Sequence, residues 1–489
     1  MIFGTTGNPL HVGIASPEIA PFAKTGGLAD VLGSLPKALQ RLGLQLTLIM
    51  PAYRTVLRSG LPLENTGVQI TVPISNRKEE GTLLKTKTDN VIPIYFIRAD
   101  QYFDRDHLYD DSGVDYPDNA ERFIFFARAI LEVLRRNPVE ILHVHDWQSA
   151  LAIVFLKAQP QLYPELLPAK AVLTIHNMGH QGLFWYLDWH LLNLPQTFFN
   201  ARFLEFHGRI NFLKGAIALA DFITTVSPTY ADEITTHDQG FGLEGILQER
   251  AASLIGILNG VDYDIWNPET DPDIHTRYGL KNLAGKKGCK ADLQRTFGLP
   301  EALDVPIIGM VSRLAAQKGL DLLEKSLDEL LCRNIQFILL GKGDRHFEGF
   351  FKSVPLKYPR KAGVRIVFDE SLARKVISGS DFFLMPSRYE PGGLTQLLSL
   401  RYGTIPVVRS TGGLRDTIEE FDQQTGEGNG FVFHNYGIDD FLAAVDRALA
   451  AFSQKENWHT LMVNAMTSDF SWSRSAQEYL KLYQKLIRS

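Results

Sequence analysis

The fold is decided by HVGIASPEIAPFAKTGGLADVLGSLPKALQRLGLQLTLIMP, residues 11–51. HVGIAS at its start and LQLTLIMP (44–51) at its end are short apolar runs typical of buried strands. Between them, LADVLGSLPKALQRLG (28–43) follows a glycine turn and carries apolar residues at helical spacing. A helix that joins two buried strands predicts a crossover connection, and therefore a parallel sheet covered on both faces.

The same alternation continues along the chain. Further strands are expected at VIPIYFIRA (91–99), ILHVHD (141–146), KAVLTIHN (170–177) and ADFITTVS (220–227). After a polar stretch bearing proline and glycine, the pattern resumes at VPIIGMVS (305–312), IQFILLGKG (335–343), VRIVF (364–368), DFFLMPS (381–387) and TIPVVRS (404–410). We therefore expect an α/β protein with two doubly wound, Rossmann-like domains, residues 1–252 and 253–465, that face each other across a cleft. Residues 466–489 are expected to form a helical segment that returns to the first domain.

The amino-acid composition argues against nucleic-acid-binding and membrane-spanning proteins. Of the 489 residues, 50 are Lys or Arg and 55 are Asp or Glu, which gives a net charge of −5 and no basic excess for nucleic acid. No run of 18 apolar residues predicts a membrane span. With two cysteines a disulfide framework is not expected, so we predict a cytoplasmic protein, with a processed plastid protein as the open alternative. The first ten residues are interpreted as a short extension without the features of a signal peptide.

Polar motifs follow nearly every expected strand, which is where α/β sheets bind ligands. In KTGGLAD (24–30), Lys24 and the amides near Gly26 and Gly27 could hold an anion at a helix start, although a plain βα turn would look the same. Arg313 and Lys318 in VSRLAAQKG could neutralise a leaving diphosphate, or could be a solvated basic loop.

SRYEPGGLTQ (387–396) is the richest of these motifs. Glu390 could bind sugar hydroxyls, while the backbone at the following glycines and at Leu394 and Thr395 could bind phosphate at a helix start. STGGLRD (410–416) is nearly identical in sequence to KTGGLAD, and we interpret it as a neighbouring turn that shapes this side of the site.

HVHDWQ (143–148) places Asp146 at a strand end beside two histidines. The carboxylate could act as an acid or base, hold a sugar hydroxyl or cap the next helix. His143 and His145 also suggest a metal, but no further ligand at recognisable spacing accompanies them. His176 and Asn177 end the next strand and should lie near Asp146. The aromatic segment HQGLFWYLDWH (180–190) could be core packing or a platform for pyranose rings.

Taken in order, these motifs resemble those of a known family. The resemblance runs from about residue 11 to the C-terminus and rests on KTGGLADV (24–31), DYPDNAERF (115–123), HVHDW (143–147), TIHN (174–177), TTVSPTYADEI (224–234), ILNGVD (257–262), VSRLAAQKGL (311–320), SRYEPGGLTQ (387–396) and STGGLRDT (410–417). The chain closely resembles the bacterial glycogen synthases and plant starch synthases. The resemblance implies the GT-B fold and the retaining transfer of glucose from ADP-glucose to the non-reducing 4-OH of an α-1,4-glucan or malto-oligosaccharide, with ADP as product and no metal or other cofactor.

The resemblance also implies roles for individual residues. It assigns catalysis to Asp146, His176, Arg313, Lys318 and Glu390, and substrate binding to Lys24, Gly26, Gly27, Asp30, Tyr109, Asn177, Asn259, Phe368, Gly392, Gly393, Leu394 and Thr395. Phe368 would lie against adenine and Asn259 near the nucleotide. Because Asp146 is the only obvious nucleophile for a double displacement and more plausibly binds hydroxyls, we favour a front-face mechanism in which the leaving phosphate helps to deprotonate the acceptor.

Three departures from the family pattern bear mainly on acceptor preference. Gly392 replaces the usual cysteine of EPCGL, Gln148 replaces a common histidine, and Phe368 with the next two residues replaces the usual YxE. A related transferase with another nucleotide sugar or acceptor therefore remains an alternative, as does a non-catalytic glucan-binding paralogue. A nicotinamide oxidoreductase would need GxGxxG after a strand, which neither half shows.

Overall fold

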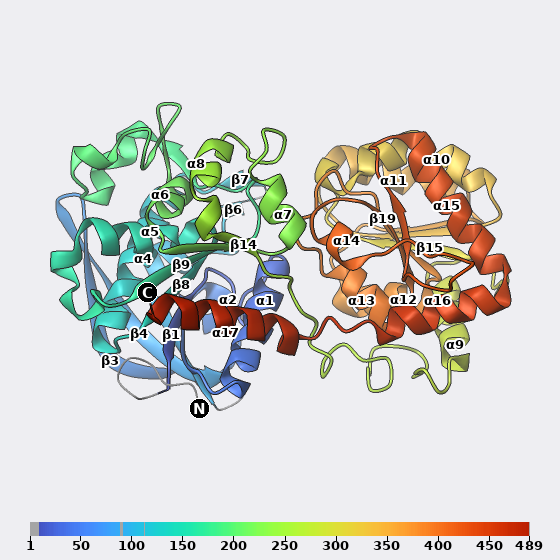
Figure 1. Ribbon diagram of the computed structural model, residues 1–489, viewed down its shortest axis with the longest axis horizontal. Coiled ribbons are helices and arrows are strands. Elements are labelled where there is room, and N and C mark those ends of the chain that lie inside the picture. Colours follow the sequence, from blue (N-terminus) through green and yellow to red (C-terminus); the bar gives the residue numbers. More distant parts are fainter. Residues whose placement is uncertain (1–8, 89–90, 112, 489) are drawn as a thin grey trace. The chain divides into compact units, whose positions relative to one another are not determined.

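The computed structural model describes residues 9–88, 91–111 and 113–488, and these divide into two compact units (Figure 1). Unit 1 extends to Leu258 and includes the C-terminal residues from Trp472 onward, while unit 2 comprises Asn259–Ser471. The extension expected at residues 1–10 falls mainly on positions 1–8, which lie outside the described residues.

Unit 1 is built on one mixed sheet in the order β14-β13-β9-β8-β1-β2-β5-β4-β3. Its strands are β1 (His11–Ala15), β2 (Gln45–Pro51), β3 (Glu64–Ile74), β4 (Arg77–Thr88), β5 (Ile92–Arg98), β8 (Ile141–His145), β9 (Lys170–Ile175), β13 (Phe222–Thr225) and β14 (Leu254–Gly256). The strands from β14 to β5 are parallel, as the crossover pattern predicts. The antiparallel hairpin of β3 and β4 at one edge was not predicted, since β3 is buried on one face only near its end.

Helices cover both faces of this sheet (Figure 1). The helices of this unit are α1 (Gly27–Arg41), α2 (Arg54–Leu57), α3 (Asp100–Phe103), α4 (Asn119–Arg136), α5 (Asp146–Ala158), α6 (Phe212–Leu219), α7 (Pro228–Glu233), α8 (Glu244–Glu249) and α17 (Trp472–Arg488). Two small sheets decorate the unit, one of β6 (Asp110–Asp111) and β7 (Val114–Asp115), the other of β10 (Leu183–Trp185), β11 (Glu205–Phe206) and β12 (Arg209–Asn211).

The C-terminal helix α17 belongs to unit 1, where it packs beside α1. Trp472, Tyr479 and Tyr483 on its buried face join the same apolar core as β1 and α4. These positions recur at helical spacing, so one stripe of α17 enters the core. Helix α17 therefore completes the apolar core of unit 1.

Unit 2 contains a fully parallel sheet in the order β17-β16-β15-β18-β19-β20. Its strands are β15 (Ile307–Val311), β16 (Gln336–Leu340), β17 (Ala362–Arg365), β18 (Phe382–Met385), β19 (Ile405–Arg409) and β20 (Phe431–Phe433). Its helices are α9 (Ala284–Thr296), α10 (Leu320–Cys332), α11 (Arg345–Lys357), α12 (Glu370–Gly379), α13 (Thr395–Arg401), α14 (Gly412–Thr417), α15 (Ile438–Ser453) and α16 (Lys455–Thr467). The strand expected at 364–368 ends at Arg365, so Phe368 lies in the loop before α12.

Both boundaries lie six residues later than the expected positions 252 and 465. β14 pairs in parallel with β13, so the residues up to Leu258 stay with unit 1. At the other crossing, the Val261 N–H donates to the Phe470 carbonyl, which keeps the chain in unit 2 through Ser471. None of the helices in the described part of the chain combines the length and the apolar character needed to cross a bilayer.

Each sheet has one point where the strand order reverses. In unit 1 the chain leaves β1 for β2 on one side and later returns to β8 on the other; in unit 2, β15 lies between β16 and β18 in the same way. Loops that leave the carboxyl ends of such strands diverge and expose a ligand crevice. Four of the polar motifs lie at these two places: KTGG and HVHD after β1 and β8 in unit 1, and VSRLAAQKG and SRYEPGG after β15 and β18 in unit 2.

Candidate active site

The loop after β1 in unit 1 folds around Glu18, a carboxylate that is only 3% exposed. One Glu18 oxygen accepts from the Thr25 amide at 2.5 Å, and the other accepts from the Thr25 hydroxyl at 2.7 Å. These charge-assisted bonds hold the KTGG turn against the end of β1. Glu18 was not singled out from the sequence, although a carboxylate directly after the first strand could have been flagged by the same rule as the other motifs.

Lys24 and Asp30 form an ion pair across this turn, with 2.7 Å between the lysine Nζ and the aspartate Oδ1. Asp30 lies in the first turn of α1, where a negative charge is favoured by the helix dipole. Gly26 precedes the helix, and a Cβ built on it would meet no atom within 4 Å. The backbone of this turn is therefore open to a ligand from that side.

Tyr109 brings a hydroxyl to the same place and donates to Glu18 Oε1 at 2.7 Å. Burial, reinforced by the Glu18 charge, holds the pKa of Tyr109 well above its usual range, so the phenol stays a donor. The Tyr109 carbonyl in turn accepts from the Asn119 side chain at 2.9 Å and from the Tyr116 amide at 3.1 Å.

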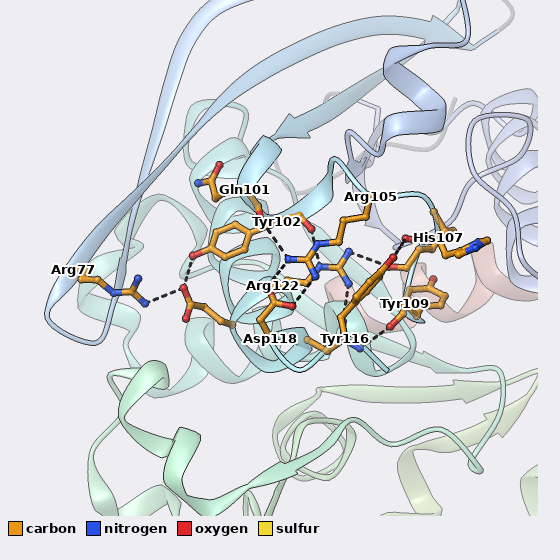
Figure 2. Close-up of polar contacts among 12 residues, drawn as sticks. Arg77, Gln101, Tyr102, Arg105, His107, Tyr109, Tyr116, Asp118 and Arg122 are labelled. Atoms are coloured by element: carbon orange, nitrogen blue, oxygen red, sulfur yellow. Dashed lines mark hydrogen bonds and ion pairs between the residues drawn. The ribbon is translucent and has the colours of Figure 1, made fainter. Parts of the chain in front are cut away.

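Arg122 supports the segment that carries Tyr109 (Figure 2). Its guanidinium is fully buried and donates to the Tyr102 carbonyl at 2.7 Å, to Asn119 Oδ1 at 2.6 Å and to the Leu108 carbonyl at 3.0 Å. Arg122 also lies 5.0 Å from the centre of the Tyr116 ring. The sequence assigned no separate role to the motif DYPDNAERF. Its residues Asn119 and Arg122 hold the backbone of the segment that carries Tyr109.

Asp146 begins α5 directly after β8 and adopts a left-handed backbone conformation with φ of 55°. Such a conformation is uncommon for residues other than glycine, although aspartate and asparagine adopt it more readily than most, and it is often found at functional sites. Its Oδ1 accepts from the His176 amide at 2.7 Å. Burial, with a further contribution from Glu18, raises the pKa of Asp146 to about 7 against the lowering effect of the His176 and Asn177 amides.

His176 follows β9 and approaches the histidine that ends β8. Its Nε2 lies 3.0 Å from His145 Nδ1, and burial lowers its pKa to about 3, so the ring is neutral at physiological pH. Asn177 turns its Oδ1 to the Gly179 amide at 2.9 Å and so ties its own loop. The expected proximity of His176 to Asp146 is observed, but His145 was considered only as a metal ligand.

The first histidine of HVHD, His143, is bonded within the core of unit 1. His143 is bonded to the Tyr483 hydroxyl through Nδ1 at 2.7 Å and to the Thr174 hydroxyl through Nε2 at 2.6 Å. Within the residues that the structure describes, no three His, Cys, Asp or Glu side chains are grouped to hold a metal ion.

In unit 2, Lys318 and Glu390 meet at the reversal point, although 72 positions separate them in the sequence. The Lys318 Nζ lies 2.6 Å from Glu390 Oε2, which also accepts from the Ser387 hydroxyl at 3.0 Å. Glu390 is 6% exposed. Gly319 has φ of 76°, and a Cβ there would lie 2.0 Å from the Pro386 carbonyl oxygen. This close approach brings the Lys318 turn against the end of β18.

The EPGG loop rests on the turn of STGGLRD. A Cβ on Gly413 would lie 2.0 Å from the Gly392 carbonyl oxygen, and one on Gly412 would lie 2.1 Å from that of Glu390. The Gly413 amide donates to the Glu390 carbonyl at 3.1 Å. Gly393 takes φ of 63° before Leu394 caps α13 at Thr395. STGGLRD, whose sequence resembles KTGGLAD, therefore supports the EPGG loop.

Among the described residues, the other predicted side chains of unit 2 make no hydrogen bond or ion pair with Lys318 or Glu390. Arg313 is exposed after β15, and Phe368 is 73% exposed in the loop before α12. Asn259 is the first residue of unit 2 and is buried. The aromatic segment of unit 1 is partly packed and partly exposed, since Trp189 is 9% exposed and Trp185 is 70% exposed.

Comparisons with known proteins agree with the division of the chain into two units. A family model described as starch synthase catalytic domain matches residues 11–249, and one described as glycosyl transferases group 1 matches residues 295–460. The chain is 47% identical to a glycogen synthase of Koribacter versatilis over 97% of this chain and 98% of the relative, and 45% identical to one of Syntrophotalea carbinolica over 98% and 99%.

Solved structures show the same relationship. The catalytic domain of starch synthase IV from Arabidopsis thaliana, bound to ADP and acarbose, superposes with a TM-score of 0.90 at 32% identity over 99% of this chain and 100% of that one. Sucrose-phosphate synthase from Thermosynechococcus elongatus gives a TM-score of 0.60 at 15% identity over 98% and 99%, which concerns the fold alone.

Proposed function

Since the chain belongs to the starch and glycogen synthase family, and is thus a glucosyltransferase of GT-B fold that elongates glucan, we propose that its donor is ADP-glucose and its acceptor the non-reducing 4-OH of an α-1,4-glucan. Transfer proceeds with retention of configuration. The observation that most strongly supports an active catalyst is the Lys318–Glu390 pair, in which a partly buried lysine faces a buried carboxylate, because a chain that only bound glucan would have no need of a largely desolvated charge pair at this position.

Unit 2 is proposed to hold the nucleotide and its phosphates. Arg313 and Lys318 neutralise the charge that develops on the departing diphosphate, and no metal is required for this step. The backbone of Gly392, Gly393, Leu394 and Thr395 binds sugar hydroxyls and phosphate, while Phe368 stacks on adenine and Asn259 lies near the nucleotide. The exposure of Arg313 and Phe368 supports these roles, since both side chains are accessible to a ligand.

Unit 1 is proposed to supply the polar groups for the glucosyl unit and the acceptor. Asp146 and His176 bind glucosyl hydroxyls, and the Lys24 turn with Gly26, Gly27 and Asp30 contacts the substrates, as do Tyr109 and Asn177. In the front-face step, the bond between the anomeric carbon and the phosphate oxygen breaks as the acceptor 4-oxygen bonds to the same face. The acceptor proton passes to the leaving phosphate, so ADP departs with it and Asp146 forms no covalent bond.

Both cysteines of the described chain, Cys289 and Cys332, are free thiols, and free thiols persist in reducing compartments. We propose a cytoplasmic location on this ground.

A donor panel tests the proposal. The purified protein is incubated with ADP-glucose, UDP-glucose or GDP-glucose and a malto-oligosaccharide, and product chain lengths are resolved. We expect elongation with ADP-glucose to exceed that with the other donors by at least tenfold. Preferred use of another nucleotide sugar would overturn the donor assignment, and consumption of no donor would overturn the catalytic role of the site.

A further inference from the structure

We propose that His145 is a positioning residue that fixes His176 in the tautomer with its proton on Nδ1, so that His176 offers a hydrogen-bond donor to a substrate oxygen. The proposal rests on the proposed function of His176 at the glucosyl unit. It concerns a residue that touches no substrate and acts only through its neighbour.

The parallel register of β8 and β9 sets up this contact. His145 pairs with Thr174, so His176 lies two residues beyond it on the neighbouring strand. The His145 Nδ1 lies 3.0 Å from His176 Nε2, and the two ring centres are 5.3 Å apart. The next residue, Asp146, accepts from the His176 backbone amide at 2.7 Å. Consecutive residues of the HVHD motif therefore hold the ring and the backbone of His176.

The contact between the two rings needs one donor and one acceptor. Burial lowers the pKa of His176 to about 3 and that of His145 well below its usual range, so each neutral ring carries a single proton. Either His145 donates from Nδ1, or His176 donates from Nε2. The two choices leave opposite chemistry at the His176 Nδ1, a donor in the first case and an acceptor in the second.

The second nitrogen of His145 decides between them. His145 is fully buried, and its Nε2 has no hydrogen-bond partner among the described residues. A proton on Nε2 would be a buried N–H without an acceptor, which proteins avoid more strictly than an unused acceptor. The proton of His145 is therefore on Nδ1 and is donated to His176 Nε2. His176 must then carry its own proton on Nδ1.

The free edge of His176 is available for a ligand. Within the described part of the chain its Nδ1 has no hydrogen-bond partner, and the residue is only partly buried. A neutral N–H at this position donates to a sugar oxygen and cannot accept the proton of a hydroxyl. The arrangement thus selects an oxygen that needs a donor, and it excludes His176 as a general base.

His143 provides a matched control on the same strand. Its ring centre is 4.3 Å from that of His145, and it is equally buried. Both of its nitrogens are occupied, by the hydroxyls of Tyr483 and Thr174, and it makes no bond to His176. Replacing His143 therefore disturbs the core to a similar degree without removing the donor to His176.

The test reads the tautomer directly by NMR of the full-length protein labelled with ¹⁵N-histidine, with the His176 signals assigned from the spectrum of His176→Gln. We expect the wild-type His176 to be protonated on Nδ1. His145→Phe keeps a ring of similar size but loses the donor, so the Nδ1–H tautomer of His176 loses its stabilising hydrogen bond. The share of His176 protonated on Nε2 should rise above that of the wild type, and kcat should fall up to about tenfold, with little change in KM for glucan. His145→Asn places an amide N–H near the former Nδ1 and should restore the tautomer and much of kcat.

Two results would overturn the proposal. One is a wild-type His176 protonated on Nε2; the other is a loss of kcat in His145→Phe no larger than in His143→Phe, for which we expect lower stability but an unchanged His176 tautomer. The spectrum separates this proposal from the proposed function, because the tautomer is read even if the protein elongates glucan with none of the donors tested.

Discussion

Lys318 and Glu390 show how the structure changes the expectation for a single residue. A lysine in a ligand-binding loop would normally be exposed and contribute little to stability. Here its side chain is 18% exposed and faces a carboxylate that is almost completely buried. Removing one partner of such a pair leaves an unpaired charge out of water, which is costly. The residue proposed to neutralise the diphosphate thus also stabilises unit 2.

Lys318→Ala should therefore lose both activity and stability. Loss of one contact to the charge that develops in the transition state reduces kcat by about 10²–10³-fold. The unpaired Glu390 should lower the free energy of unfolding by about 3 kcal/mol. Kinetics with ADP-glucose and urea unfolding followed by circular dichroism measure the two effects.

A second substitution separates these effects. Glu390→Gln in the Lys318→Ala background should restore most of the stability but none of the activity, because it removes the buried charge without replacing the cation. Lys325→Ala, at an exposed position of α10, controls for loss of a positive charge and should leave both quantities unchanged. A Lys318→Ala enzyme within threefold of wild type would contradict the role of this lysine.

Asp146 should make the free energy of unfolding of the protein depend on pH. Its pKa in the folded protein is raised to about 7 from an ordinary value of 3.8, so the folded state binds the proton more tightly than the unfolded state. The stability that it contributes is fully present below about pH 4 and is lost as pH rises to about 7. Asp146→Asn has no carboxyl to ionise, and asparagine tolerates the left-handed backbone at this position.

The variant Asp146→Asn should therefore unfold at a higher temperature than wild type at pH 8. The difference should shrink steadily between pH 7 and pH 4, as followed by calorimetry. At one pH unit per 1.36 kcal/mol, the change over this range is at most about 4 kcal/mol. A difference in melting temperature that does not vary with pH would contradict the raised pKa of Asp146.

At the scale of elements, the supports of the site were harder to predict than its loops. Each apolar run ends at a polar motif, so the sequence predicts where the strands stop and which loops bear chemistry. It does not reveal which turns lie on top of one another. STGGLRD contacts the EPGG loop because β18 and β19 are neighbours. Arg122 supports Tyr109 because it donates from α4 to the Tyr102 and Leu108 carbonyls. These contacts depend on tertiary packing and leave no local signal.

Gly413 tests the support of the EPGG loop. A Cβ at Gly413 would lie 2.0 Å from the Gly392 carbonyl oxygen, so Gly413→Ala must displace the EPGG loop. We expect kcat with ADP-glucose to fall at least tenfold, while the circular dichroism spectrum stays that of the wild type. Gly349→Ala in α11 is the matched control, because its Cβ would meet no atom within 4 Å and alanine favours a helix. Equal activity of the two variants would show that STGGLRD does not position the loop.

Across the whole molecule, the sequence was sufficient to predict the parallel part of both sheets but not every strand or partner. The βα alternation specifies the sheets, and the point of strand reversal in each one explains why the candidate residues fall into two groups. The hairpin of β3 and β4 was missed because its alternating, half-exposed pattern is weaker than a buried run. Glu18, His145 and Ser387 were missed as partners because nothing local shows which buried polar groups meet.

The discontinuous architecture of unit 1 makes α17 a determinant of its stability. The hydroxyl of Tyr483 is bonded to His143 on β8, and both residues are fully buried. Tyr483→Phe leaves His143 Nδ1 without its partner and should destabilise unit 1 by about 1–3 kcal/mol. Calorimetry should show this as a lower melting temperature. Tyr358→Phe, which removes an exposed hydroxyl contact to Asp328 in unit 2, should melt as the wild type does. Equal melting of the two variants would contradict the structural role of α17.

The chemical event assigned to these residues is the transfer of glucose from ADP-glucose to the end of a glucan. The most direct measurement is ¹H NMR of the wild-type protein with ADP-glucose and a malto-oligosaccharide labelled at its reducing end, with Lys318→Ala in parallel. We predict that one ADP is released for each new α-1,4-linked glucose, that growth occurs only at the unlabelled end, and that Lys318→Ala is slower by at least a hundredfold. Release of ADP without growth of the glucan, or formation of β-linked product, would contradict the account.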